Sequence, residues 1–411
     1  MGTRTWVGLA IIMSLWATNR AVAADWSIVP SISQRFEYNS NFNTTPTSKL
    51  GDFISTTNPS AAFIYATEAA KLQGSVGISQ LLYLKNTGYN HTDQNYQING
   101  QYSLTPRFNV SLNTSFISDS TAQQEFLTSG LTITRTPRLS FTAGPGISYN
   151  LTERLSATIS YNFNKVIYQP SQTTQSQNFQ NYSSQAVSLM WQYLFSEKTT
   201  ISTTFSGTET TYTGSTGSDY KSLLVSLGVN HKFSERWQFN AAGGINYSSY
   251  SNNSQIASAG QFPLFVSVPT QTQKGTNFSP YFNLGATRSW TNLSLTGSFS
   301  RNQSASAFGY IAQVNALSLG MNYRFTEKLT GSLSGSYALS SQSSNQNQNQ
   351  TNNVSVNSGL SYQITERLTA SPGYTFSSQL YGGNNSSSSS NSKVHVAYLM
   401  LNYSYPLHYM R

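Results

Sequence analysis

Tyr149-Asn150-Leu151-Thr152-Glu153-Arg154-Leu155 is a turn motif that returns, with small changes, along most of this chain. An aromatic and an apolar residue, two positions apart, end one run of alternating residues. A Thr-Glu-Arg turn follows, and an apolar residue opens the next run. A motif repeated at hairpin spacing predicts that the whole chain is one array of β-hairpins.

Copies of the turn motif give an expected strand count. Good copies start at five further positions, which are Tyr102, Tyr193, His231, Tyr323 and Tyr362. Two weaker copies lie at 65–72 and 284–290. Together with the copy at Tyr149, these motifs make eight short turns, which join sixteen strands. A first strand over 26–38 and a last strand over 393–405 raise the expected number to about eighteen, with sixteen as the alternative if the pair around Leu284 is over-read.

The residues after each turn alternate in polarity. After the turn at 152–154, apolar and polar side chains take opposite faces: Leu155, Ala157, Ile159, Tyr161 and Phe163 against Ser156, Thr158, Ser160, Asn162 and Asn164. The polar face is almost wholly uncharged, and charged residues are only 9% of the chain, against about 25% in ordinary soluble domains. An apolar outside around a polar inside predicts an all-β transmembrane antiparallel up-and-down β-barrel, with short periplasmic turns and longer extracellular loops.

The amino terminus has the pattern of a signal peptide. Arg4 precedes an apolar stretch over 6–16, and Ala21-Val22-Ala23 is a small-residue cleavage site. We expect residues 1–23 to be removed and residues 24–411 to form a single outer-membrane barrel domain. The expected partners are outer-membrane lipid and the barrel-insertion machinery, although Arg411 is not the terminal aromatic residue that many such barrels carry.

Charged side chains outside the turns fall into two groups by strand parity. The first group is expected to point into the lumen: Arg35, Glu37, Lys85, Arg138, Lys232 and Arg324. Rings of Arg or Lys favour anions, so this group predicts weak anion selectivity. The alternative is that these charges are paired within the wall or masked by loops. The second group is expected to face outward near lipopolysaccharide phosphates, or to form a solvated rim: Lys165, Lys221, Arg301 and Lys393.

Composition and motifs argue against several functions. The net charge is +9, but much of the basic charge sits in the exposed turns beside glutamates, so nucleic acid is not an expected partner. The chain has no cysteine, and its four histidines show no metal-ligand spacing. No nucleophile or phosphate-loop motif is present. An enzyme is not expected, nor a cofactor or a metal.

Aromatic residues and long connections complete the expected barrel. The tyrosines of the turn motif predict an interfacial girdle that faces lipid, whereas Tyr83 is expected to face inward. The connections Ser118–Thr136 and Ser251–Thr276 carry apolar residues, so either is a candidate to fold in and narrow the pore. The connection Asn302–Ala307 is expected outside the cell. Pro145 and Pro372 fall inside expected strands, where we expect bulges or strand ends.

The opening of the mature chain resembles a known family. Val29-Pro30-Ser31-Ile32-Ser33, Arg35-Phe36-Glu37-Tyr38-Asn39, Asp52-Phe53-Ile54-Ser55-Thr56 and Asn58-Pro59-Ser60 resemble the β-barrel porin family associated with exopolysaccharide and PEP-CTERM/exosortase systems. The resemblance is sharpest over about the first hundred residues. It implies an outer-membrane channel, with polysaccharide export as one role, and offers no binding residues to carry over.

Three functions therefore remain open at this point. The first is a porin-like channel that passes hydrophilic solutes and weakly favours small anions. The second is an export pore for an exopolysaccharide. The third is a closed structural or adhesive barrel, whose Ser/Asn/Gln-rich loops at 344–350 and 384–390 contact partners.

Overall fold

The computed structural model describes residues 25–120, 136–169, 179–213, 218–254, 271–342, 349–383 and 390–410. Apart from one short 3-10 turn (η1, Thr87–Tyr89), every element is a strand. The strands are β1 (Asp25–Asn39), β2 (Asp52–Ala66), β3 (Ala70–Tyr83), β4 (His91–Thr105), β5 (Phe108–Ser120), β6 (Pro137–Asn150), β7 (Leu155–Tyr168), β8 (Asn181–Ser196), β9 (Thr199–Thr213), β10 (Ser218–Ser234), β11 (Trp237–Ser254), β12 (Gln271–Ser289), β13 (Leu293–Ala305), β14 (Ile311–Arg324), β15 (Leu329–Gln342), β16 (Asn349–Gln363), β17 (Leu368–Gly383), β18 (Ser390–Ser404) and β19 (Leu407–Met410).

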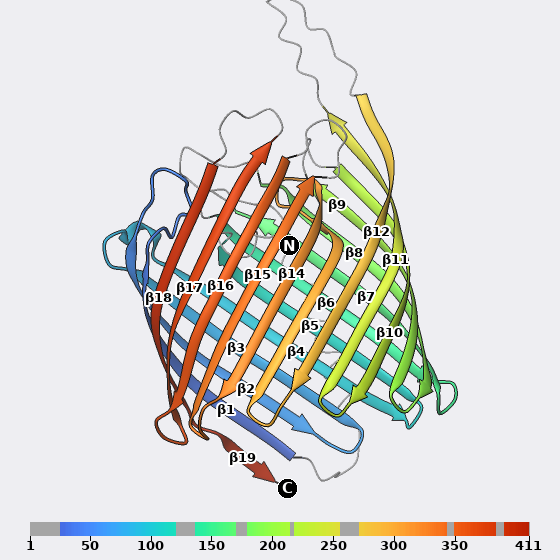
Figure 1. Ribbon diagram of the computed structural model, residues 1–411, viewed down its shortest axis with the longest axis horizontal. Coiled ribbons are helices and arrows are strands. Elements are labelled where there is room, and N and C mark those ends of the chain that lie inside the picture. The colour runs from blue at the N-terminus through green and yellow to red at the C-terminus, as the bar shows by residue number, and fades with distance from the viewer. Residues whose placement is uncertain are drawn as a thin grey trace, which may run out of the picture.

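The strands close into an antiparallel up-and-down barrel (Figure 1). Each strand from β1 to β18 pairs with its neighbours in the sequence, and β1 closes the ring by pairing with β18. The short β19 continues β18 after Pro406 and pairs with the first residues of β1. The wall therefore has eighteen strands, which confirms the number expected from the turn motif.

The hydroxyl group of the turn motif explains why threonine or serine recurs there. Thr152 Oγ1 accepts the backbone N–H groups of Arg154 at 3.2 Å and Leu155 at 3.0 Å. The same pair of bonds forms at Thr105, Ser234, Thr326 and Thr365. This side chain satisfies donors that a tight turn leaves without a strand partner. The Glu and Arg that follow lie exposed at the tip.

Proline positions depart from expectation. Pro145 and Pro372 both lie inside continuous strands, and neither produces a bulge or a strand end. At each, cross-strand pairing lapses toward one neighbour for two residues and resumes in the same register. The register shifts occur instead beside short turns, as at Ser103/Thr105. A missing N–H weakens one ladder locally, but pairing on the other side holds the strand in place.

The two faces of the wall differ as the alternation predicts. Large apolar side chains on alternate positions are exposed on the outside, for example Ile159, Leu223 and Phe278. The tyrosines of the turn motif, among them Tyr102, Tyr149, Tyr193 and Tyr362, are also exposed near the short turns, in agreement with the expected girdle. No helix in the described part of the chain is long and apolar enough to cross a membrane.

Several expectations fall outside the described residues. These are the signal peptide over 1–23, most of the two candidate plug connections (121–135 and 255–270), and most of the two low-complexity tracts, over 343–348 and 384–389.

Candidate channel lumen

Uncharged polar side chains line the inner face of the wall. One lumen-facing row crosses seven consecutive strands, β3 to β9, through the register partners Ser75, Gln97, Ser115, Thr142, Asn164, Ser184 and Thr210. Some of these residues bond to each other, as Thr210 does to Ser184 at 3.0 Å. Hydroxyl and amide groups of this kind can exchange hydrogen bonds with water and with hydrophilic solutes.

Arg35 and Glu37 face the lumen near the long-loop end of β1, as parity predicts. Arg35 Nε lies 2.6 Å from Glu37 Oε2, so the two charges neutralise each other. The Arg35 guanidinium also lies 3.9 Å from the centre of the Tyr398 ring. That ring lies against Gly373 on β17, where a Cβ would overlap it. Glycine at this position therefore lets Tyr398 lie flat on the wall and support Arg35.

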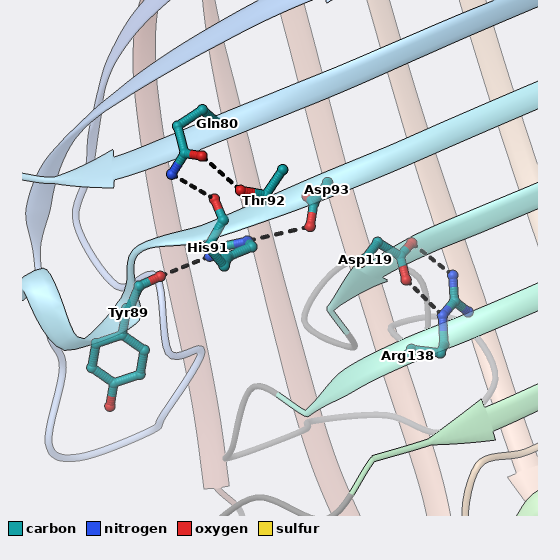
Figure 2. Close-up of polar contacts among 7 residues, drawn as sticks. All are labelled: Gln80, Tyr89, His91, Thr92, Asp93, Asp119 and Arg138. Carbon is teal, nitrogen blue, oxygen red and sulfur yellow. Dashed lines mark hydrogen bonds and ion pairs between the residues drawn. The ribbon is translucent and has the colours of Figure 1, made fainter.

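A second ion pair lies on the neighbouring part of the lumen wall (Figure 2). Arg138 on β6 donates from Nε to Asp119 Oδ1 at 2.9 Å and from Nη2 to Oδ2 at 2.8 Å. Asp93 on β4 lies next to Asp119, one step beyond the Gln94–Ser118 register pair. His91 Nε2 is 3.5 Å from Asp93 Oδ1. Both lumen arginines near the long-loop end thus have a carboxylate partner.

Two carboxylates on the lumen face, Asp119 and Asp93, were not predicted from the sequence. Asp119 was expected in the connection Ser118–Thr136, but β5 continues to Ser120 and holds Asp119 opposite Arg138. Asp93 alternates with outward-facing residues of β4, so its parity was a usable signal. The long-loop end of the lumen therefore carries more negative charge than expected.

The remaining charges expected in the lumen lie elsewhere. Lys232 and Arg324 are exposed at the short-turn ends of β10 and β14, on the inner face by register. Lys85 lies in the loop after β3, where strand parity does not apply. Its backbone N–H, with that of Asn86, donates to the Asp52 carboxylate, which is almost fully buried and fixes this loop.

All four lysine or arginine residues expected on the outer rim lie on the outer face by register. Lys165 and Lys393 lie on the outer face near the long-loop end. Lys221 also faces outward, and its Nζ lies 2.9 Å from Glu209 Oε1, so its charge is paired. Arg301 pairs with the outward-facing Phe282, but its guanidinium contacts the β13–β14 hairpin, as described below.

An aromatic cluster narrows one side of the lumen. The loop between β1 and β2 folds inward and buries Phe42 against Ile54 and Tyr83. The Phe42 ring lies 5.0 Å from the Tyr83 ring and 4.9 Å from the Tyr89 ring, centre to centre. The inward orientation expected for Tyr83 is therefore confirmed. Asn41 Nδ2 donates to Ser392 Oγ at 3.3 Å and so ties the loop to β18, the strand that closes the barrel against β1.

The β13–β14 hairpin narrows the other side. β13 pairs with β12 only as far as the Phe282–Arg301 partners, and above this point it lies inside the barrel. Its Gln303 accepts from Asn246 Nδ2 at 2.8 Å and from the Tyr220 hydroxyl. Both partners belong to the lumen face of the wall, because their outward neighbours Tyr247 and Lys221 face lipid. The expectation that Asn302–Ala307 lies outside the cell was wrong.

Arg301 lies at the last β12–β13 partners, where its register is outward as expected but its guanidinium bonds to Gln313 of the hairpin. Gln313, with its carboxamide oxygen toward Arg301, accepts from Arg301 Nε at 2.6 Å and Nη2 at 2.9 Å. The same oxygen accepts from Ser279 Oγ at 2.7 Å, and Ser279 is buried on the lumen face of β12. The face of β13 that would meet lipid is here covered by β12, so Arg301 lies between hairpin and wall.

The tip of the hairpin reaches strands on the far side of β10. Ser306 N–H donates to the Tyr212 hydroxyl of β9 at 3.2 Å, and that hydroxyl donates to Tyr310 O at 2.9 Å. Ala307 O accepts from Gln180 N–H at 2.7 Å. Ala307 also packs with Val166 and Tyr168 of β7. The tip therefore crosses the inner faces of several strands.

The outer apolar band, the aromatic girdle and the polar inner face describe one architecture. The chain is an outer-membrane β-barrel. No family model matches the sequence, and no curated protein matches it. Among the described residues no group of three or more His, Asp or Glu side chains could hold a metal ion.

Several solved structures are similar to the barrel over most of its length. Pseudomonas aeruginosa OccK2 (OpdF) has a TM-score of 0.47 and 11% identity, with 95% of this chain and 100% of that chain covered. The Copper transporter OprC has a TM-score of 0.45 and 10% identity, with coverages of 94% and 82%. Pseudomonas aeruginosa OpdK with vanillate has a TM-score of 0.46 and 8% identity, with coverages of 92% and 99%. Similarity at this level indicates no substrate.

Proposed function

We propose that this protein is an outer-membrane channel for small hydrophilic solutes. The observation that supports the proposal best is the row of uncharged polar side chains that crosses β3 to β9 inside a closed eighteen-stranded wall. A barrel that served only as a scaffold could fill its interior with apolar side chains, whereas hydroxyl and amide rows keep water in the lumen. The hairpin and the β1–β2 loop narrow that lumen, which favours small solutes.

Reconstitution tests the proposal directly. Purified barrel in a planar bilayer should give discrete ionic currents, and proteoliposomes that contain it should swell in small neutral sugars. A matched preparation denatured by boiling serves as the control. Folding is checked by the different gel migration of boiled and unboiled samples. A correctly folded barrel that gives neither current nor swelling would contradict a channel and favour the closed structural or adhesive barrel.

A weak preference for anions is a finer part of the proposal. The ion pairs of Arg35 and Arg138 cancel the positive charge near the long-loop end. Lys232 and Arg324 remain at the short-turn mouth, and within the described part of the chain no carboxylate lies within 4.0 Å of either. The zero-current potential under a KCl gradient should show chloride preference, and the double variant Lys232→Gln/Arg324→Gln should lose it.

Export of an exopolysaccharide is the competing function, supported by the resemblance of the first hundred residues to a family associated with such systems. It predicts that deleting the gene lowers the mass of secreted polysaccharide. Uptake of small solutes predicts instead unchanged secretion and slower entry of hydrophilic solutes. The two outcomes separate the functions without knowledge of the cargo.

A further inference from the structure

We infer that Gln303 and Gln313 determine the size limit of the channel, because they dock the β13–β14 hairpin onto the lumen wall. This inference rests on the proposed function and names the element that would select its solutes. The hairpin occupies lumen space from β12 across to β7. Whatever passes through the barrel must pass beside it.

The seam between β12 and β13 gives the hairpin a second place to lie. β11 and β12 continue past the last β12–β13 partners toward the top of Figure 1. Beyond Phe282, the edge of β12 that faces β13 therefore has no strand partner. Beyond Arg301, the edge of β13 that faces β12 has none either. Continued in register, Asn302 would meet Tyr281, and Gln303 would meet Pro280. Antiparallel backbone hydrogen bonds could therefore join these two strand edges.

Pro280 biases the choice toward the docked position. Proline lacks the backbone N–H that a ladder bond requires, so pairing across the seam is weakened two residues above its present end. Docking replaces the missing ladder with side-chain bonds, in which Gln303 accepts from Asn246 and Gln313 accepts from Ser279. The two glutamines therefore hold the β13 side of the hairpin, where the ladder with β12 is missing, whereas β14 stays paired with β15 up to Ala312.

The docking contacts are polar and incompletely satisfied. Among the described residues, Asn246 Oδ1 and Gln303 Nε2 are buried without a hydrogen-bond partner. A buried polar network with unmet groups is less stable than one in which every group is paired. Only the Arg301–Gln313 contact in this set carries a charge. We call the contacts of Gln303 and Gln313 with the wall the clasp. The clasp can therefore open without breaking an ion pair, and β13 can then pair along β12 while β14 keeps its ladder with β15.

Truncation of the clasp gives the first test. The variant Gln303→Ala/Gln313→Ala should admit neutral oligosaccharides that wild type excludes, measured as swelling of proteoliposomes in sugars of one to four rings. Asn357→Ala is the matched control, since Asn357 is an exposed lumen amide on β16, away from the hairpin. Gel migration of unboiled samples verifies folding. Equal size limits in the folded clasp variant and wild type would overturn the inference.

Cross-linking gives the second test, and the absence of cysteine makes it specific. A short bis-methanethiosulfonate reagent on Asn246→Cys/Gln303→Cys should fix the hairpin in the docked position. Large conductance steps should disappear and return when a thiol reductant removes the bridge. The control pair is Ser298→Cys/Ser318→Cys, whose hydroxyls lie 2.6 Å apart in the part of β13–β14 that stays in the wall.

The two tests separate failure of the inference from failure of the channel. Current that is the same in the bridged and reduced forms would show that the hairpin does not control passage, while the channel stands. Absence of current in every folded form, wild type included, would remove the channel itself. A change in the control pair equal to that in the docking pair would also contradict the inference, because it would point to bridging of any kind.

Discussion

Arg138 on β6 and Asp119 on β5 form a bidentate ion pair on the lumen face, with N–O distances of 2.9 and 2.8 Å. Both side chains are largely buried, at 9% and 12% exposure. Removal of either partner would change the net charge beside the pore by one unit. The pair therefore sets a local charge balance that single substitutions can shift in either direction.

Asp119→Asn should make the channel more selective for anions, because it removes one negative charge from the lumen wall. Arg138→Gln should shift selectivity toward cations for the opposite reason. The zero-current potential under a salt gradient measures both. Glu209→Gln is the matched control, since it breaks the Lys221–Glu209 pair on the outer face with the same change of charge as Asp119→Asn. Equal shifts in Asp119→Asn and Glu209→Gln would show that the lumen position does not matter.

Gly373→Ala should destabilise the barrel by about 1–3 kcal/mol, because the added Cβ overlaps the Tyr398 ring. The temperature at which the unboiled band is lost on a gel should fall. Gly243→Ala is the control, where the nearest atom to an added Cβ is 3.9 Å away. Combining Gly373→Ala with Tyr398→Ala should cost less than the sum of the two changes. Strict additivity would contradict the steric explanation.

Thr152→Ala should lower stability by about 1 kcal/mol, because two backbone N–H groups lose their acceptor. The midpoint of urea unfolding in lipid vesicles measures the change. Glu153→Gln, at the exposed tip of the same turn, should leave the midpoint within error. Thr326→Ala and Thr365→Ala should repeat the Thr152 result, since their bonds are the same. An unfolding midpoint that falls in Glu153→Gln but not in Thr152→Ala would contradict a stabilising role for the Thr152 hydroxyl.

Lys165→Gln/Lys393→Gln should reduce the lipopolysaccharide that co-purifies with the barrel, if these outward lysines contact its phosphates. Lys221→Gln should change it less, because Glu209 already neutralises that lysine. Quantifying lipid phosphate per barrel after detergent extraction checks the prediction. Retention that is unchanged in the double variant would leave these lysines as a solvated rim.

The sequence alone determined the wall. Turn motifs at hairpin spacing predicted about eighteen strands, with sixteen as the alternative, and the period-two alternation predicted which side chains face lipid. These features depend on local chemistry, such as the Thr152 hydroxyl that satisfies its own turn. Parity correctly placed Arg35, Glu37 and Arg138 on the inner face for the same reason.

Only the tertiary structure decided what occupies the lumen. Parity assumes that every strand stays in the wall, so it did not predict the contact of Arg301 with Gln313. The connection Asn302–Ala307 was expected outside the cell because it joins two strands at their long-loop ends. Contacts between residues far apart in the chain, such as Gln303 with Asn246 and Tyr310 with Tyr212, bring the hairpin inside instead. The partners of the lumen arginines depend on the same kind of information, because a register between neighbouring strands, and not a local pattern, sets Asp119 opposite Arg138.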